Sequence, residues 1–180
     1  MMFRKVFLSL SLMVACSIPA YGQTLKADKE KSKINFVGKK PDGKHEGGFK
    51  EFKSEAKVDM DSPDKSSLNI EITTDSLWSD NEMLTGHLKN PDFFDVKKYP
   101  KIKFESTKVK VEDDKVTISG KLTMLDKTVD VEIPAESEID DKTLKLTADF
   151  KIDRTKWGMV YGKGKVDDEV ALKIELVFPR

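Results

Sequence analysis

Cysteine is nearly absent from this sequence, which holds only Cys16 in 180 residues. A lone cysteine excludes an intrachain disulfide, and the chain beyond it offers no thiol for catalysis. Histidine is almost as scarce: His45 and His87 lack the close spacing typical of zinc ligands. The Gly-x-Ser-x-Gly elbow of serine hydrolases is missing too. We therefore expect a protein that is not an enzyme, with no catalytic residue, no metal site and no cofactor.

Long hydrophobic runs are missing except near the N-terminus. Arg4 and Lys5 precede an apolar or small stretch over residues 6–15, and Ala20-Tyr21-Gly22 then supplies small residues at alternate positions. This pattern is typical of a secretory signal peptide cleaved after Gly22, and the apolar stretch is too short to span a bilayer. We expect a signal peptide over 1–22, one domain over 23–180, no transmembrane segment, and a periplasmic or secreted location.

Residues 13–16, Met-Val-Ala-Cys, allow a second interpretation. They resemble a bacterial lipoprotein processing site, which would make a lipid-modified Cys16 the first mature residue. Leucine is the usual residue where Met13 stands, and Ala20-Tyr21-Gly22 is an ordinary signal-peptidase site, so we favour cleavage after Gly22. The lipid-anchored form remains the alternative.

An excess of charge of either sign is also lacking, because 32 basic residues balance 32 acidic ones. Arg4 and Lys5 fall in the expected signal peptide, which leaves the rest at about −2. Lysine alternates with aspartate or glutamate from Lys50 to Asp61, as on a solvated face. Nucleic acid is therefore not an expected partner.

Apolar residues alternate with polar ones through most of the chain, which is the period of a strand with one dry face. The pattern predicts an all-β protein of eight antiparallel strands, because turn signals such as Asp61-Ser62-Pro63-Asp64 separate the runs. The apolar parity switches between Ile102 and Val111, which predicts a bulge near Ser106 to Lys108. The predicted strands lie around 34–36, 52–60, 68–72, 102–111, 116–124, 129–135, 144–152 and 170–178.

One segment has helical spacing instead. Ser79-Asp80-Asn81-Glu82 has the form of a capping box, and Asn90-Pro91 ends the run. We expect one short helix over about Asp80 to Lys89, covering an end of the barrel. The residues expected to face the interior are Met83, Leu84, His87 and Leu88.

Several inward positions carry small side chains, which would leave a solid interior underfilled. They are Ser54, Ala56, Gly120, Ala135, Ser137 and Ala148. We therefore favour a closed barrel with a dry cavity over two packed sheets, since eight strands suffice to enclose one small ligand. On this interpretation Gly120 borders the ligand, and a larger side chain there would fill ligand space.

Residues 84–106 carry a specific motif. His87-Leu88, Asp92-Phe93-Phe94-Asp95, Tyr99-Pro100 and Phe104-Glu105-Ser106 closely resemble the signature of the YceI-like family. Gly120-Lys121-Leu122-Thr123, Asp153-Arg154 and Trp157-Gly158-Met159 match further pieces in order. Many relatives carry Arg-Asp before the His-Leu pair, where this chain has Thr85-Gly86.

The resemblance implies an extended lipocalin-like antiparallel β-barrel whose lumen holds a long apolar lipid, such as a polyisoprenoid or isoprenoid quinone. It thus implies a carrier or sequestering protein. The alternative is a structural or interaction barrel without lipid, whose loops bind a partner. His87 and Arg154 are candidate head-group contacts, and the oligomeric state, including a homodimer, stays open. The predicted lumen contacts are Phe36, Leu84, Leu88, Phe104, Ile118, Gly120, Leu122, Ile133, Leu146, Ala148, Phe150 and Ile174.

Overall fold

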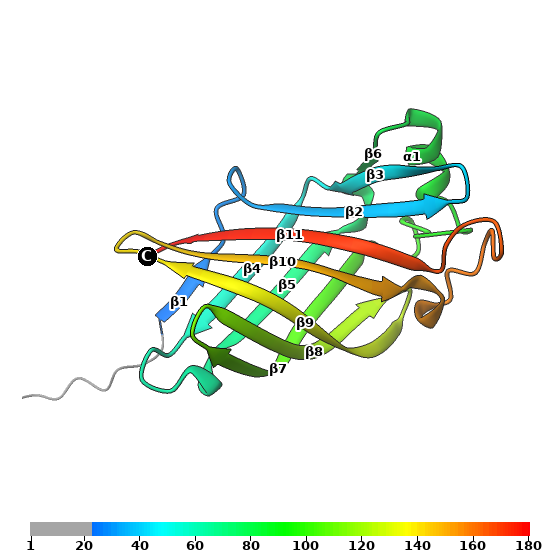
Figure 1. Ribbon diagram of the computed structural model, residues 1–180. Helices are drawn as coiled ribbons and strands as arrows, with labels where there is room; N and C mark the ends of the chain where they lie inside the picture. Colours follow the sequence, from blue (N-terminus) through cyan, green and yellow to red (C-terminus); the bar gives the residue numbers. More distant parts are fainter. Residues whose placement is uncertain (1–22) are drawn as a thin grey trace, which may run out of the picture.

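The computed structural model describes residues 23–180, so the expected signal peptide and Cys16 lie outside the described residues. Strands dominate this part of the chain, and α1 (Glu82–Leu88) is its one α-helix (Figure 1). The strands are β1 (Gln23–Lys26), β2 (Lys33–Lys40), β3 (Gly43–Phe49), β4 (Phe52–Val58), β5 (Ser67–Thr73), β6 (Leu77–Ser79), β7 (Lys101–Glu112), β8 (Lys115–Met124), β9 (Lys127–Ile139), β10 (Thr143–Asp153) and β11 (Glu169–Pro179). Short 3₁₀ helices lie at η1 (Pro63–Lys65), η2 (Thr74–Ser76) and η3 (Arg154–Trp157).

All eleven strands form one sheet in the order β1-β4-β5-β7-β8-β9-β10-β11-β2-β3-β6. Neighbouring strands pair antiparallel, and the sheet curls around a long axis (Figure 1). Just after β1, the N–H of Asp28 donates to the carbonyl of Val177 in β11 at 2.8 Å. Val177 in turn donates its N–H to Ser32 Oγ at 3.0 Å. These bonds join two parts of the sheet that lie far apart in the strand order.

The all-β, lipocalin-like prediction is confirmed, but the predicted count of eight strands is corrected to eleven. The additional strands are β1, β3 and β6. β1 has four residues and β6 three, too few to show a period. β3 contains Gly47 and Gly48, where an added Cβ would lie 2.5 Å from the Phe36 ring and from Asn35 Oδ1 respectively. Neighbouring atoms pack so closely against this strand that it requires glycine at both positions. Because glycine is neither a large apolar nor a polar residue, β3 lacks the alternation that predicts a strand.

The predicted bulge is present, because the β7–β8 register shifts between Ser106 and Lys108.

The helix exists, but its cap differs from the prediction. Asn81, not Ser79, is the N-cap, and its side chain accepts from the N–H of Leu84 at 2.9 Å. Ser79 Oγ instead donates to the Asn81 carbonyl at 2.7 Å. The β6 strand extends through Ser79, so the helix can begin only after the chain has turned.

Candidate functional site

An apolar cavity of about 360 Å³ lies inside the curled sheet. This volume falls in the range of small-molecule sites, roughly 300–1,000 Å³. The inward residues of β2, β5, β7, β8, β9, β10 and β11 form its wall, so the strand periodicity directly produces an apolar lining. The strand residues of the lining include Ile34, Phe36, Ile70, Ile72, Ile102, Phe104, Leu122, Val131, Ile133, Phe150, Leu172 and Ile174.

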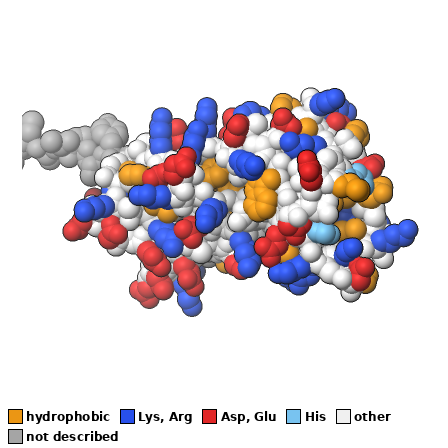
Figure 2. Space-filling view, turned by 90° about the horizontal axis from the view of Figure 1, so that it is seen from above, with side chains coloured by type: hydrophobic (Ala, Val, Ile, Leu, Met, Phe, Trp, Pro, Cys, Tyr) orange, Lys and Arg blue, Asp and Glu red, His pale blue; other side chains and the backbone are white. Residues whose placement is uncertain are grey.

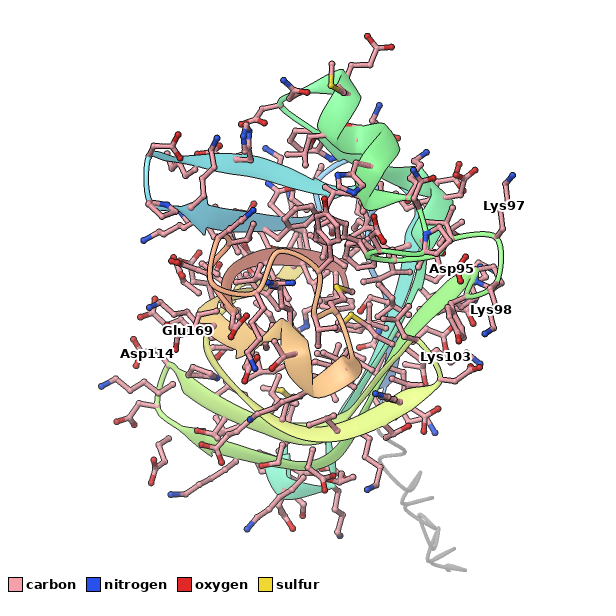
Figure 3. All side chains as sticks on the ribbon, turned by 90° about the vertical axis from the view of Figure 1, so that its right-hand side faces the viewer. Asp95, Lys97, Lys98, Lys103, Asp114 and Glu169 are labelled. Carbon is pink, nitrogen blue, oxygen red and sulfur yellow. The ribbon has the colours of Figure 1, made fainter. Side chains whose placement is uncertain are left out.

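The polar lining residues gather where three segments meet: the β2–β3 hairpin, residues 158–168, and α1. We call this end the mouth. Lys39, Lys40 and His45 line the cavity from the hairpin, and the two lysines are exposed, so the cavity reaches solvent there. Figure 3 faces this end, with α1 above and η3 in front of the interior. Lys97 and Lys98, on the connection from α1 to β7, point outward and away from the cavity.

Arg154 fixes the segment 158–168 across the mouth. The Arg154 side chain is 4% exposed, and each of its five N–H donors meets an oxygen of that segment. The acceptors are the carbonyls of Met159 (2.7 Å), Tyr161 (2.9 Å), Asp167 (3.0 Å) and Val166 (3.4 Å), and Asp168 Oδ1 (3.3 Å). A guanidinium has no sixth donor. The predicted head-group role of Arg154 is therefore corrected to a structural one, although the residue borders the cavity.

The neighbours of Arg154 shape the same segment. Asp153 caps η3, since its carboxylate accepts from the N–H (2.9 Å) and Oγ1 (2.6 Å) of Thr155. These bonds stabilise the ionised form and lower the pKa of Asp153. Trp157 is 1% exposed and donates its ring N–H to the Leu122 carbonyl at 2.9 Å. Gly158 then turns the chain with φ of +92°, where a side chain is disfavoured. The Asp-Arg and Trp-Gly-Met pieces thus build one wall of the mouth.

His87 does not line the cavity. Its Nε2 lies 3.0 Å from Asp92 Oδ2, and its ring meets Phe93 and Tyr161 edge-on at centroid distances of 5.1 and 4.9 Å. The histidine therefore joins α1 to the segment held by Arg154, and its head-group role is corrected to a packing one. Met83 is corrected as well, because it is 86% exposed rather than inward. Leu84 and Leu88 do line the cavity.

A second histidine contact connects Asp80, which precedes α1, to strand β3 of the sheet. His45 lies in β3, and its Nδ1 is 2.9 Å from Asp80 Oδ1. The N–H of Glu46 donates to Asp80 Oδ2 at 2.9 Å. The backbone bond from Glu46 and the contact with His45 lower the pKa of Asp80. Neither histidine ring has a serine hydrogen-bond partner within residues 23–180.

Eight of the twelve predicted lumen residues line the cavity: Phe36, Leu84, Leu88, Phe104, Leu122, Ile133, Phe150 and Ile174. Ile118 and Leu146 line a smaller cavity toward the opposite end of the sheet. Gly120 and Ala148 line neither cavity. An added Cβ on Gly120 would lie 2.6 Å from the Phe104 ring and from the Glu105 carbonyl oxygen. Gly120 is therefore a site of close packing, and the expectation that it borders empty ligand space is corrected.

Sequence reasoning missed several lining residues. Phe49 lies in the unrecognised strand β3, and Phe93 and Phe94 lie between α1 and β7, outside the predicted strands. Phe94 packs its ring on Phe36 and Phe49 at 6.5 and 5.6 Å. The aromatic density of residues 92–95 was the available signal. Gly38 was also missed: it lines the cavity, and an added Cβ there would meet no atom within 4 Å.

The outer surface differs sharply from the cavity. Figure 2 shows basic and acidic side chains intermixed over one face, with apolar side chains between them. Within residues 23–180 no three His, Cys, Asp or Glu side chains gather as metal ligands would. None of the described helices is long and apolar enough to cross a membrane.

Comparisons with known proteins agree with this geometry. The model of the YceI-like domain family matches residues 25–178. A UPF0312 protein of Pseudomonas putida is 36% identical over 134 residues, covering 68% of this chain and 67% of the relative. The crystal structure of Burkholderia cenocepacia BcnA has a TM-score of 0.79 at 28% identity, covering 84% of this chain and 98% of that one.

A polyisoprenoid binding domain from Saccharophagus degradans shares the fold, with a TM-score of 0.66 at 12% identity over 88% of this chain and 98% of that one. The domain match spans nearly all the described residues and includes both the cavity wall and the segments at its mouth. The resemblance inferred from the motif is confirmed, and the chain belongs to the YceI-like family.

Proposed function

We propose that this protein is an exported carrier or sequestering protein that binds a long apolar lipid, a polyisoprenoid or isoprenoid quinone, inside the curled sheet. The observation that carries the proposal is the apolar cavity of about 360 Å³. Burial of a hydrocarbon chain there contributes roughly 25 cal/mol of favourable free energy per Å² of apolar area, before the cost of ordering both partners is subtracted. The polyisoprenoid binding domain from Saccharophagus degradans, which has the same fold, supports this ligand class.

The mouth suits the polar end of such a lipid. Lys39, Lys40 and His45 are the polar residues of the hairpin that border the cavity. These three replace His87 and Arg154 as our candidate head-group contacts. We propose binding and not catalysis as the activity, and the apolar lining of the cavity supports this choice.

Mass spectrometry of organic extracts from the natively purified protein tests the proposal. We expect a recurrent isoprenoid or quinone in the wild-type extract. Gly38→Leu should reduce the lipid recovered severalfold, because the new side chain enters open space in the cavity. Gly86→Leu is the matched control, since Gly86 also has open space but lies exposed on α1. Empty extracts, with no lipid acquired on incubation, would instead favour the alternative of a barrel whose loops bind a partner.

Export is a separate part of the proposal. It is supported by the basic, apolar and small-residue order of residues 1–22. N-terminal sequencing of the mature protein should give Gln23 as the first residue. A lipid-modified Cys16 would show the anchored form, and an intact Met1 would contradict export by this signal.

A further inference from the structure

A second apolar cavity, of about 140 Å³, lies toward the opposite end of the sheet. Its wall includes Val109, Val116, Ile118, Leu144 and Leu146. Met60, Val111 and Ile139 also line it and are 60%, 40% and 47% exposed, so this cavity too meets solvent. The curled sheet therefore contains two apolar spaces, one toward each end.

A single layer of inward residues separates the two spaces on at least two strands. Along β8, Leu122 lines the first cavity, Gly120 lines neither, and Ile118 lines the second. Along β10, Phe150, Ala148 and Leu146 repeat that order. Successive inward residues of a strand are roughly 7 Å apart. The layer between the two cavities is therefore one residue thick on these strands. The residues in that layer, Gly120 and Ala148, have almost no side chain.

The ring of Phe104 fills the space that Gly120 leaves. It comes from β7, lines the first cavity, and is 4% exposed. Two of its ring carbons would lie 2.6 Å from a Cβ added to Gly120. Phe104 is thus the large side chain that covers the small residue between the two cavities.

Ser54 marks the same boundary on β4. It pairs with Ile70, which lines the first cavity, and the next inward residue, Ala56, lines the second. Ser54 is 3% exposed, and its hydroxyl has no hydrogen-bond partner among residues 23–180. A buried hydroxyl without a partner is costly, and a polar group or a water that reached this boundary would satisfy it.

We propose that Phe104, lying on Gly120, is a partition that sets the length of apolar chain this protein accepts. The inference rests on the proposed lipid-binding function. With the ring in place, a chain entering at the mouth ends against Phe104 and gains nothing from the second cavity. Without the ring, the two spaces join and a longer chain is buried further.

The test titrates farnesol, geranylgeraniol and solanesol, three prenyl alcohols of increasing length, against wild type and Phe104→Leu. In the wild type we expect little gain in affinity from geranylgeraniol to solanesol. In Phe104→Leu the affinity ratio of solanesol to geranylgeraniol should rise about tenfold, since each newly buried CH₂ contributes up to about 0.8 kcal/mol before ordering costs. Phe104→Met also removes the ring and is similar in volume to leucine but more flexible, so it is the second variant should leucine weaken the fold.

Two further variants control the result. Phe93→Leu removes a ring from the same cavity at the mouth, where Phe93 packs on His87 and Tyr161, so it should weaken all three alcohols alike. Adding Ile118→Phe to Phe104→Leu fills the second cavity and should cancel the gain for solanesol. A length ratio unchanged in folded Phe104→Leu and Phe104→Met overturns the partition and leaves lipid binding standing. Failure of every variant and of the wild type to bind any alcohol overturns both.

Discussion

At the scale of single residues, the inward positions of the strands were largely predictable and their packing was not. Alternation places Phe36, Phe150 and Ile174 on the inner face, and all three line the cavity. Gly120 has the same parity but lies under a ring from another strand. That contact depends on the β7–β8 register, which includes a bulge, and one strand's sequence does not reveal it.

Gly120→Ala should therefore destabilise the fold. The new Cβ would meet the Glu105 carbonyl oxygen, which is backbone and cannot rotate aside. We expect a loss of about 1–3 kcal/mol, typical of overpacking. Gly86→Ala is the control, and it should gain up to about 1 kcal/mol because it replaces an exposed helix glycine. Chemical denaturation measures both, and a neutral Gly120→Ala would contradict close packing at this position.

Arg154 makes a second prediction at this scale. Arg154→Lys keeps the charge but cannot reach five separated oxygens, so carbonyls of residues 159–167 lose their donors. We expect a loss of about 1–3 kcal/mol, as for buried polar groups left unpaired. Hydrogen exchange should accelerate in residues 158–168 first. The exposed neighbour Lys156→Met should leave that segment protected, and equal exchange in both variants would refute the anchoring role.

Asp80 gives a prediction in pH. Its pKa is lowered from 3.8 by the Glu46 N–H and His45, so the ionised form stabilises the folded state. That contribution is present above the unfolded pKa and is lost as the pH falls through the folded pKa. The stability difference between wild type and Asp80→Asn should be constant at neutral pH and shrink below about pH 4. A difference that persists unchanged in acid would mean that the charge of Asp80 does not matter.

At the scale of elements, long strands with a clear period were predictable, and short or glycine-bearing ones were not. β1 and β6 are stabilised as strands by pairing with β4 and β3, which their short sequences do not indicate. β3 contains glycines because other residues pack closely against it, and these glycines interrupt its alternation. The helix was predictable from its spacing. The cap residue was not predictable, because Ser79 belongs to strand β6 and the helix begins only after Asn81.

We predict that α1 governs entry of the lipid. The helix has seven residues, too few to be stable alone in water, so docking of Leu84 and Leu88 on the cavity should hold it in place. Replacing both leucines by alanine should speed exchange of a fluorescent isoprenoid analogue severalfold while far-UV strand content is kept. Met83→Ala, on the exposed side of the same helix, should change nothing.

The outcome against this prediction is specific. Hydrogen exchange first confirms that α1 has lost protection in the double variant. Unaltered lipid exchange in that same sample would show that α1 is a structural plug and that the lipid enters elsewhere. The exposed apolar lining at the second cavity is then the next candidate entrance.

At the scale of the whole molecule, the all-β architecture followed from the period of the sequence and the family from the motif around His87. The cavity was expected from small inward residues, yet Gly120 and Ala148 lie between two cavities instead of beside one. Curling of the sheet and large side chains from opposite strands decide where the space remains. The curl and the distances between opposite strands depend on all eleven strands of the sheet together. Local sequence patterns therefore located the interior but not its shape.

The measurement that tests the central claim most directly is isotope-filtered NMR of the protein with methyl-labelled Ile and Leu, bound to geranylgeraniol. The account predicts intermolecular NOEs from the prenyl chain to Ile34, Ile133 and Ile174, which line the first cavity on three different strands. Ile139, exposed and far from that cavity wall, is the internal control and should show none. NOEs confined to surface methyls, or none at saturating lipid, would contradict an apolar lipid held inside the curled sheet.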